Sequence, residues 1–378
     1  FLSACYNAGD ITDGCAFTMP NLNLSSCTTL NTLFYGTRTG NTVGAVASSI
    51  DVSGWTLRAA GVTMANTFNR LTKKSGVTLT MDLSGWSNTN GITSLDKTFR
   101  DTELTSINTT GWDTSNVTTM AQCFYNSDIL THVTGLDGWS ADKVVKLDYF
   151  MHNCKVYNFG ATDANFGTNF MDDNAGTCNT MLSMFFYVGS TTAGSAPPNV
   201  TNWDTSGVTS FNSMFEKCNW TGGGNLDVSS WDVGSATGSA LIDMFHTSPT
   251  TVADTSAWEI PSGVTSLSQF LRDSEITTID FSDASCDLSG ITTCATFGYK
   301  SKMTRFILHG SSDLGACTNF SNFFPASGYA TVVSGDYDAL LLRLAATNTN
   351  ASVTLYAGSS TYTGGGAVAT ARAALITL

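Results

Sequence analysis

Ten cysteines and four histidines are the side chains of this 378-residue chain best suited to nucleophilic or metal chemistry. No two cysteines form a CxxC pair, and no histidine belongs to an HExxH motif or a zinc-type Cys/His spacing. The glycine run at 222–224 lacks the lysine of a phosphate-binding loop. We therefore assign no catalytic residues and no bound organic cofactor, and we expect a protein that is not an enzyme.

Acidic residues offer a second kind of chemistry. Several short runs alternate apolar, polar and apolar residues, and their middle residues are Asp51, Asp82, Asn108, Asn199, Asp227 and Asp254. If these runs are neighbouring strands, their carboxylates lie about 4.8 Å apart and repel one another. Calcium bound by Asp51, Asp82, Asp227 and Asp254 would relieve that repulsion. The alternative is that each side chain closes a local turn with backbone amides.

The elements that position these residues are repeated. The pattern Val-x-x-Met-x-x-Met-Phe, with each letter taken as a hydrophobic class, fits residues 117–124 and 208–215. Its last position recurs at residues 2, 34, 68, 99, 124, 151, 185, 215, 245, 271, 298 and 324. Twelve approximate copies of a unit of about 29 residues indicate a repeat array.

Each unit contains further signals of its structure. Seven of the eight tryptophans lie five to seven residues before the Val position, as Trp112 does before Val117. The alternating run before each tryptophan predicts a half-buried strand, as at residues 50–52, 81–83, 226–228 and 279–281. The apolar spacing after Val indicates a short helix or helical turn. Stacking such units buries a continuous core, so the sequence predicts an α/β solenoid of about twelve leucine-rich-repeat-like units with one parallel strand per turn.

The last 43 residues break this period. We predict a solenoid domain at residues 1–335 and a small α/β capping module at residues 336–378, since an array needs an atypical end unit to cover its last core face. Within the module, residues 337–346 and 367–376 read as helices and residues 353–356 as a strand.

The cysteines occupy positions that hold Val, Met or Trp in other units. Cys178 and Cys317 stand in the Val position, for example. We expect mostly buried, reduced thiols that pack as small hydrophobes, with one pair within reach across adjacent turns. Cys286 and Cys294 are the closest of these in sequence. A disulfide framework remains the alternative for an extracellular protein.

The units at residues 112–120 (WDTSNVTTM) and 214–218 (MFEKC) resemble the BspA-like leucine-rich repeat of bacterial surface proteins. The resemblance covers residues 1–335 and implies an extracellular binding solenoid, either a bacterial adhesin or a phage-encoded appendage. The C-terminal module resembles the one that closes phage-encoded members, through YDALL at 337–341 and AxARxxLI at 369–376. The family resemblance implies no catalytic residues at any position of this chain.

One column of residues varies while its neighbours keep their type. It directly follows the last repeat position, and its members are Tyr35, Asn69, Arg100, Tyr125, His152, Phe186, Glu216, His246, Arg272 and Tyr299. Exposed aromatic and arginine side chains are typical of recognition surfaces, and aromatic faces stack on sugar rings. We expect ligand binding by Tyr35, Arg100, Tyr125, His152, Phe186, His246, Arg272 and Tyr299. The alternative is that these side chains only cover their neighbours.

The composition of the chain limits the kinds of partner that it can bind. With 17 basic and 30 acidic residues, the net charge is −13, and no basic cluster offers a footprint for nucleic acid. No apolar stretch is long enough to span a membrane. We expect an extracellular recognition protein on a phage virion, a fibre or decoration that attaches to a host surface glycan or protein. Other virion or surface proteins, or further copies of the chain, are additional partners. The alternatives are a bacterial cell-surface adhesin and a purely structural filament or capsid protein.

Overall fold

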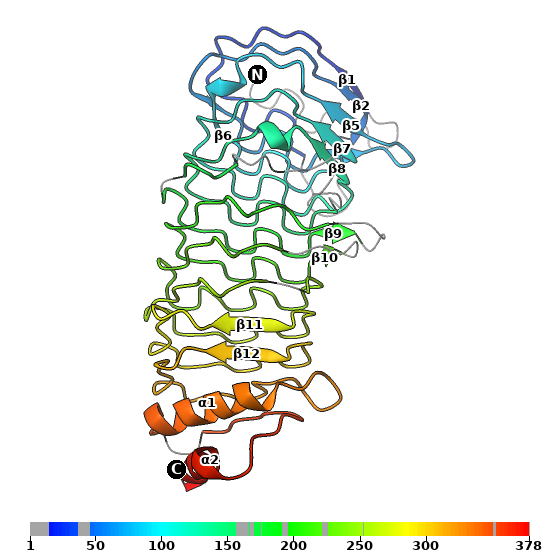
Figure 1. The fold of residues 1–378 in the computed structure, drawn as a ribbon. Coiled ribbons are helices and arrows are strands. Elements are labelled where there is room, and N and C mark those ends of the chain that lie inside the picture. The colour runs from blue at the N-terminus through cyan, green and yellow to red at the C-terminus, as the bar shows by residue number, and fades with distance from the viewer. Residues whose placement is uncertain are drawn as a thin grey trace. The chain divides into compact units, whose positions relative to one another are not determined.

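The computed structural model describes residues 15–36, 46–155, 166, 170–174, 176–190, 196–220, 226–251, 253–350 and 353–377. The chain divides into two compact units: residues 1–203 with 219–222, and residues 204–218 with 223–378. Within each unit, successive turns of the chain stack in parallel (Figure 1). The predicted solenoid is therefore confirmed. Eleven of the twelve predicted repeat endings lie in the described residues, and the copy ending at Leu2 lies outside them.

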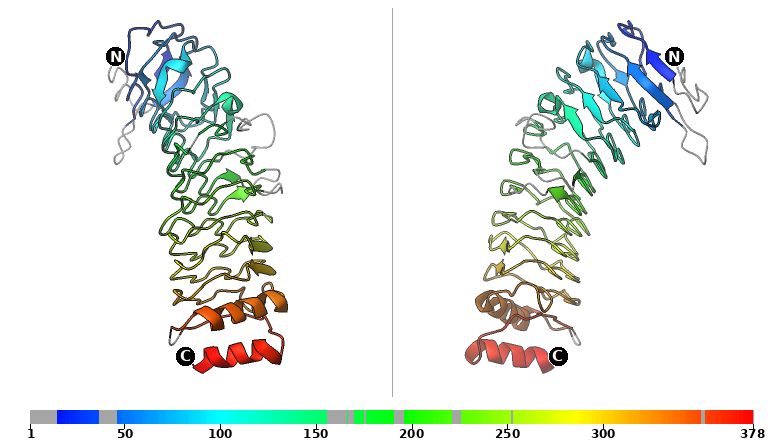
Figure 2. Two further views of the ribbon diagram at one scale, coloured as in Figure 1. Left: turned by 60° about the vertical axis from the view of Figure 1, so that its left-hand side comes forward. Right: turned by 90° about the vertical axis from the view of Figure 1, so that its right-hand side faces the viewer.

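Short parallel strands follow one another through the first unit (Figure 2). Their order is β1–β2–β4, β3–β6, β5–β7–β8 and β9–β10. They are β1 (Cys15–Thr18), β2 (Val46–Asp51), β3 (Val62–Thr63), β4 (Thr72–Lys73), β5 (Thr80–Asp82), β6 (Ile92–Ser94), β7 (Ser106–Asn108), β8 (His132–Thr134), β9 (Gly189–Ser190) and β10 (Asn219–Trp220). Two 3-10 helices, η1 (Thr89–Gly91) and η2 (Leu136–Gly138), lie between strands. The register pairs Met81 with Ile107 and Ile107 with Val133, so one buried position aligns from turn to turn.

The second unit holds β11 (Thr278–Phe281) and β12 (Arg305–Leu308), which pair in parallel. Single bridges join Thr293 to Ser266 and to Asn319 in the neighbouring turns. The predicted strands at 50–52, 81–83 and 279–281 overlap β2, β5 and β11. The run at 226–228 forms no strand, although its apolar residues are buried as predicted.

Aromatic rings stack along the core of the first unit. Trp55 lies 5.0 Å from Trp86, Trp86 lies 5.5 Å from Trp112, and Trp112 lies 6.0 Å from Trp139. A second column joins Phe34, Phe68, Phe99 and Phe124, with ring centres 5.3–5.4 Å apart. In the second unit, Phe270 stacks on Phe297 at 5.7 Å. All seven predicted tryptophans are buried, which confirms the proposed core positions.

Of the two forms predicted for the segment after each Val position, a short helix or a helical turn, the described residues form turns and no helix. In residues 120–127 the amides of Cys123, Tyr125 and Ser127 close three local turns by donating to carbonyls three residues earlier. The alternate amides, those of Gln122, Phe124 and Asn126, donate instead to carbonyls of the next turn at 2.7–2.9 Å. Gln122 and Asn126 adopt left-handed backbone angles, with φ of 57° and 54°. A helix would use every amide internally, so this linked-turn geometry is what joins one unit to the next.

Two helices end the chain, as predicted. Helix α1 (Ser334–Thr347) buries Leu340, Leu341 and Leu344, and helix α2 (Gly366–Thr377) packs against it. The predicted strand at residues 353–356 is reduced to a single parallel bridge between Leu355 and Phe320.

Candidate functional site

Four of the predicted binding residues form one continuous stack on the first unit. The guanidinium carbon of Arg100 lies 4.9 Å from the centre of the Tyr125 ring. Tyr125 stacks on His152 at 4.8 Å, and His152 stacks on Phe186 at 4.5 Å. We call Arg100, Tyr125, His152 and Phe186 the ring column. All four side chains are partly exposed.

The linked turns explain how the ring column is built. Tyr125 lies between Phe124 and Asn126. Their amides donate to the carbonyls of Phe150 and His152, respectively, in the next turn. Successive column residues therefore follow one another at roughly the spacing of the turns. Because His152 is nearly parallel to both Tyr125 and Phe186, at 18° and 8°, its two faces are covered. The ring edges, and not the flat faces expected from the sequence, are what His152 presents outward.

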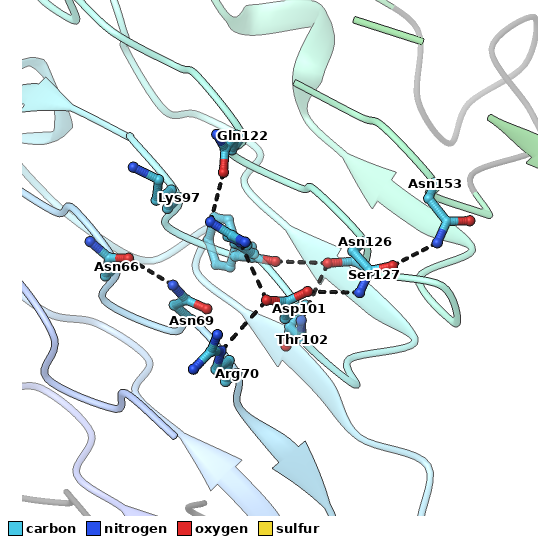
Figure 3. Close-up of polar contacts among 12 residues, drawn as sticks. Asn66, Asn69, Arg70, Lys97, Asp101, Thr102, Gln122, Asn126, Ser127 and Asn153 are labelled. Atoms are coloured by element: carbon cyan, nitrogen blue, oxygen red, sulfur yellow. Dashed lines mark hydrogen bonds and ion pairs between the residues drawn. The ribbon is translucent and has the colours of Figure 1, made fainter. Parts of the chain in front are cut away.

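A row of polar side chains joins successive turns (Figure 3), and each of its members directly follows a residue of the ring column in the sequence. Asn153 Nδ2 donates to Asn126 Oδ1 at 2.6 Å, and Asn126 Nδ2 donates to Asp101 Oδ1 at 2.7 Å. We call Asp101, Asn126 and Asn153 the polar ladder. Arg70 Nε and Arg100 Nε lie 3.6 and 3.3 Å from the other Asp101 oxygen. One carboxylate therefore forms ion pairs with two guanidinium groups.

Sequence reasoning missed the polar ladder. Its members lie two residues after the last repeat position of three successive units, ending at Phe99, Phe124 and Met151. All three adopt left-handed backbone angles, with φ of 53–54°. Asn and Asp tolerate that conformation better than other non-glycine residues. Recurrence of Asn or Asp at one repeat position was therefore the signal that could have located the ladder.

The other predicted binding residues do not join the ring column. Tyr35 lies beneath Arg70 at 5.8 Å, and in the second unit Tyr299 lies beneath Lys300 at 5.3 Å. Arg272 pairs with Asp273 at 3.2 Å. Two column positions, Asn69 and Glu216, are buried and do not face outward as expected. The predicted column is thus a ring stack in the first unit and a series of charged contacts in the second.

His246 lies between two carboxylates of the second unit. Its Nδ1 is 3.3 Å from Glu216 Oε1 and 3.2 Å from Asp243 Oδ1, and Lys217 Nζ is 2.8 Å from the same Glu216 oxygen. Burial lowers the pKa of His246, but Asp243 and Glu216 outweigh it and raise that pKa to about 9. Burial raises the pKa of Glu216, but His246, Lys217 and Ser213 outweigh it and lower that pKa to about 2.

These pKa shifts predict a pH-dependent stability. The contribution of His246 to the free energy of unfolding is complete below its unfolded pKa near 6.5 and is lost as the pH rises through 9. The Glu216 contribution is complete above its unfolded pKa near 4.5 and is lost as the pH falls through 2. In metal-free buffer, the free energy of unfolding is expected to fall by about 1–2 kcal/mol between pH 6.5 and 9.5, after allowance for solvent screening.

Urea unfolding followed across that range measures the loss, with His246→Ala as the comparison. The variant lacks the titrating group, so its stability is expected to change less than that of the unmodified chain over the same interval. Parallel curves for the two proteins would show that His246 is not the group responsible.

The aspartates of the alternating runs accept hydrogen bonds from backbone amides two residues further on. Asp51 Oδ1 accepts the Ser53 amide at 3.1 Å and its hydroxyl at 2.7 Å. The same Asx turn occurs at Asp82, Asp227 and Asp254, each toward the serine two residues on, and at Asn108 and Asn199 toward threonine. The Ser53 contacts lower the pKa of Asp51. The local-turn alternative thus describes all six positions. None of the four calcium candidates belongs to a ligand cluster within the described residues.

Eight described cysteines are free thiols, and seven of them are buried. Cys294 neighbours Cys317 of the next turn, and Cys123 neighbours Cys154; the two that are closest in sequence, Cys286 and Cys294, are not one of these pairs. The neighbouring Cys317 thiol and burial together raise the pKa of Cys294. Cys317 occupies the Val position of the turn after Cys294, so the stacking register brings them together. Cys5 lies outside the described residues.

The repeat region matches a known protein family. A family model described as "Mycoplasma protein of unknown function, DUF285" matches residues 62–185 and 179–296, together more than half of the chain. The chain belongs to the DUF285 family. The match supports the BspA-like repeat predicted from the sequence, and the first matched segment of this DUF285 protein contains most of the ring column. No curated protein and no solved structure matches the chain. No helix in the described ranges is long and apolar enough to cross a membrane.

Proposed function

We propose that this DUF285 protein is a non-enzymatic recognition protein that works outside the cell, on the surface of a particle or of a bacterium. The observation that carries the proposal is the ring column, in which four unlike side chains from successive turns form one partly exposed stack. In a solenoid such a column can vary from unit to unit while the core is kept, which is how repeat proteins build binding surfaces.

The geometry of the ring column favours a polar ligand. Aromatic edges carry partial positive charge, so they suit hydroxyl and carbonyl oxygens better than apolar surface. The polar ladder beside them supplies carboxamide and carboxylate groups, which hydrogen-bond sugar hydroxyls and peptide groups. We therefore propose a host surface glycan or protein as the ligand, contacted by ring edges and ladder amides together.

The acidic character of the chain shapes the same proposal. A net charge of −13 gives no general attraction to anionic cell surfaces. Binding is therefore expected to depend little on ionic strength when the calcium concentration is held constant, because short-range contacts dominate.

Within this proposal, two settings have separate support. The C-terminal module resembles the end of phage-encoded arrays, which favours a virion fibre or decoration protein. The family model names Mycoplasma proteins, which favours a bacterial surface adhesin. Antibodies raised against the chain and applied to intact virions and intact cells separate the two, because only the surface that carries the protein will be labelled.

The test of recognition is a screen of the whole chain against a glycan array and against intact host cells, with recovered ligand analysed by mass spectrometry. We expect saturable binding to a defined ligand whose mass is unchanged. Loss of binding in the double variant Tyr125→Ala, Phe186→Ala would assign it to the ring column. A chemically altered ligand would contradict the non-enzymatic proposal, and an absence of binding to any cell or glycan would favour the structural alternative.

A further inference from the structure

Three ligand-type side chains meet on the second unit. Glu216 comes from one turn, and Asp243 and His246 come from the next. Their potential metal-binding atoms, one from each residue, all lie within 4.8 Å of one another. Within the described ranges no other three His, Cys, Asp or Glu side chains gather in this way.

The distances in this cluster match those between the ligands of one ion. His246 Nδ1 is 3.3 Å from Glu216 Oε1 and 3.2 Å from Asp243 Oδ1. Zinc binds nitrogen and oxygen at about 2.0–2.1 Å in tetrahedral geometry, which separates two ligand atoms by about 3.3 Å. Two edges of the cluster therefore already have the spacing that a tetrahedral ion requires.

Two of the three ligand atoms are also buried without a well-formed hydrogen bond. His246 Nδ1 and Asp243 Oδ1 are both hidden from solvent, and neither has a hydrogen-bond partner of acceptable geometry. The two side chains are only 12% and 18% exposed. A divalent ion that takes the place of the His246 proton would bind both atoms at once, with release of that proton to solvent.

From this geometry we infer that Glu216, Asp243 and His246 form a binding site for a divalent transition metal such as Zn²⁺. One imidazole and two carboxylates suit zinc, whereas calcium takes six to eight oxygen ligands. Three protein ligands leave the fourth tetrahedral position open for water or another ligand. The inference does not depend on the proposed recognition by the ring column, which belongs to the other unit.

Lys217 competes with the metal for the Glu216 carboxylate. Its Nζ lies 2.8 Å from Glu216 Oε1, but its side chain is 43% exposed. Because this side chain is partly exposed, it can turn into solvent when an ion takes its place beside Glu216. Removing the lysine is therefore expected to strengthen metal binding, whereas removing any of the three ligands weakens it.

The test uses the whole chain, freed of metal with a chelator and titrated with Zn²⁺ by calorimetry. We expect one equivalent to bind, with at least tenfold weaker binding in both His246→Ala and Asp243→Asn. Binding is expected to be tighter in Lys217→Ala and unchanged in the control His309→Ala. Asp243→Asn preserves shape and decides the matter if His246→Ala fails to fold.

Co²⁺ in place of Zn²⁺ identifies the ligands, because the chain also has ten cysteines. The ligand-field bands of tetrahedral cobalt without a thiolate charge-transfer band would support the site. A thiolate band, failure of Zn²⁺ to bind at millimolar concentration, or unchanged affinity in Asp243→Asn would overturn it. Calcium titrated in parallel should give no comparable heat, and a calcium affinity equal to that for zinc would also contradict the assignment.

Discussion

Replacing Trp112 by alanine is expected to lower the free energy of unfolding by about 3–5 kcal/mol, the usual cost of removing a large buried aromatic side chain. Trp112 is only 2% exposed and stacks on Trp86 and Trp139 in the two neighbouring turns. Its Nε1 also donates to the Leu83 carbonyl at 3.0 Å. Urea unfolding followed by circular dichroism measures the loss.

Hydrogen exchange should place that loss in the turns next to residue 112, since repeat units contact mainly their neighbours. Tyr187→Ala is the control, because its side chain is 49% exposed, and its effect is expected to stay within about 0.5 kcal/mol. If Trp112→Ala were as stable as the control, the tryptophan column would not support the core.

Gly135→Ala is expected to destabilise the first unit by about 2–5 kcal/mol, through two separate costs. Gly135 has a φ of 90°, and a left-handed backbone costs an L-residue about 1–2 kcal/mol. A Cβ at this position would also lie 2.4 Å from the Thr110 amide nitrogen and 2.5 Å from the Thr109 carbonyl carbon. Overpacking of this kind adds about 1–3 kcal/mol.

Gly111→Ala separates these two costs. Gly111 has a similar φ of 84°, but a Cβ there would meet nothing within 4 Å. Its substitution is expected to cost only the conformational part, about 1–2 kcal/mol. Equal midpoints for the two variants in chemical unfolding would mean that adjacent turns do not approach as closely at Gly135 as the structure shows.

The core was predictable from the sequence because burial follows the repeat. Tryptophan and phenylalanine recur at fixed positions, and parallel stacking brings equal positions together, as Phe68, Phe99 and Phe124 illustrate. The linked turns were not predictable, because the apolar spacing of residues 117–124 is the same for a helix as for turns that expose alternate amides to the next unit. The left-handed residues Gln122 and Asn126 decide between them.

The candidate site was only partly predictable, for a related reason. Sequence spacing identified the members of the ring column, but how the rings contact one another depends on the register between turns, which the sequence does not state. The same register pairs Cys294 with Cys317, 23 residues on, in preference to Cys286, eight residues before it. Asp51 was ambiguous, since a carboxylate that could bind calcium is equally able to cap the turn at Ser53.

The most direct test of the account is the affinity of the chain for the ligand that the screen identifies, measured for Tyr125→Ala and for Thr118→Ala. Thr118 is exposed, and its hydroxyl donates to the Thr93 carbonyl, so it controls for a surface change outside the ring column. We predict at least tenfold weaker binding for Tyr125→Ala, a loss of about 1.4 kcal/mol or more, and no change for Thr118→Ala, with both variants folded. Equal affinities for the two variants and the unmodified chain would show that the ring column is packing and not a recognition surface.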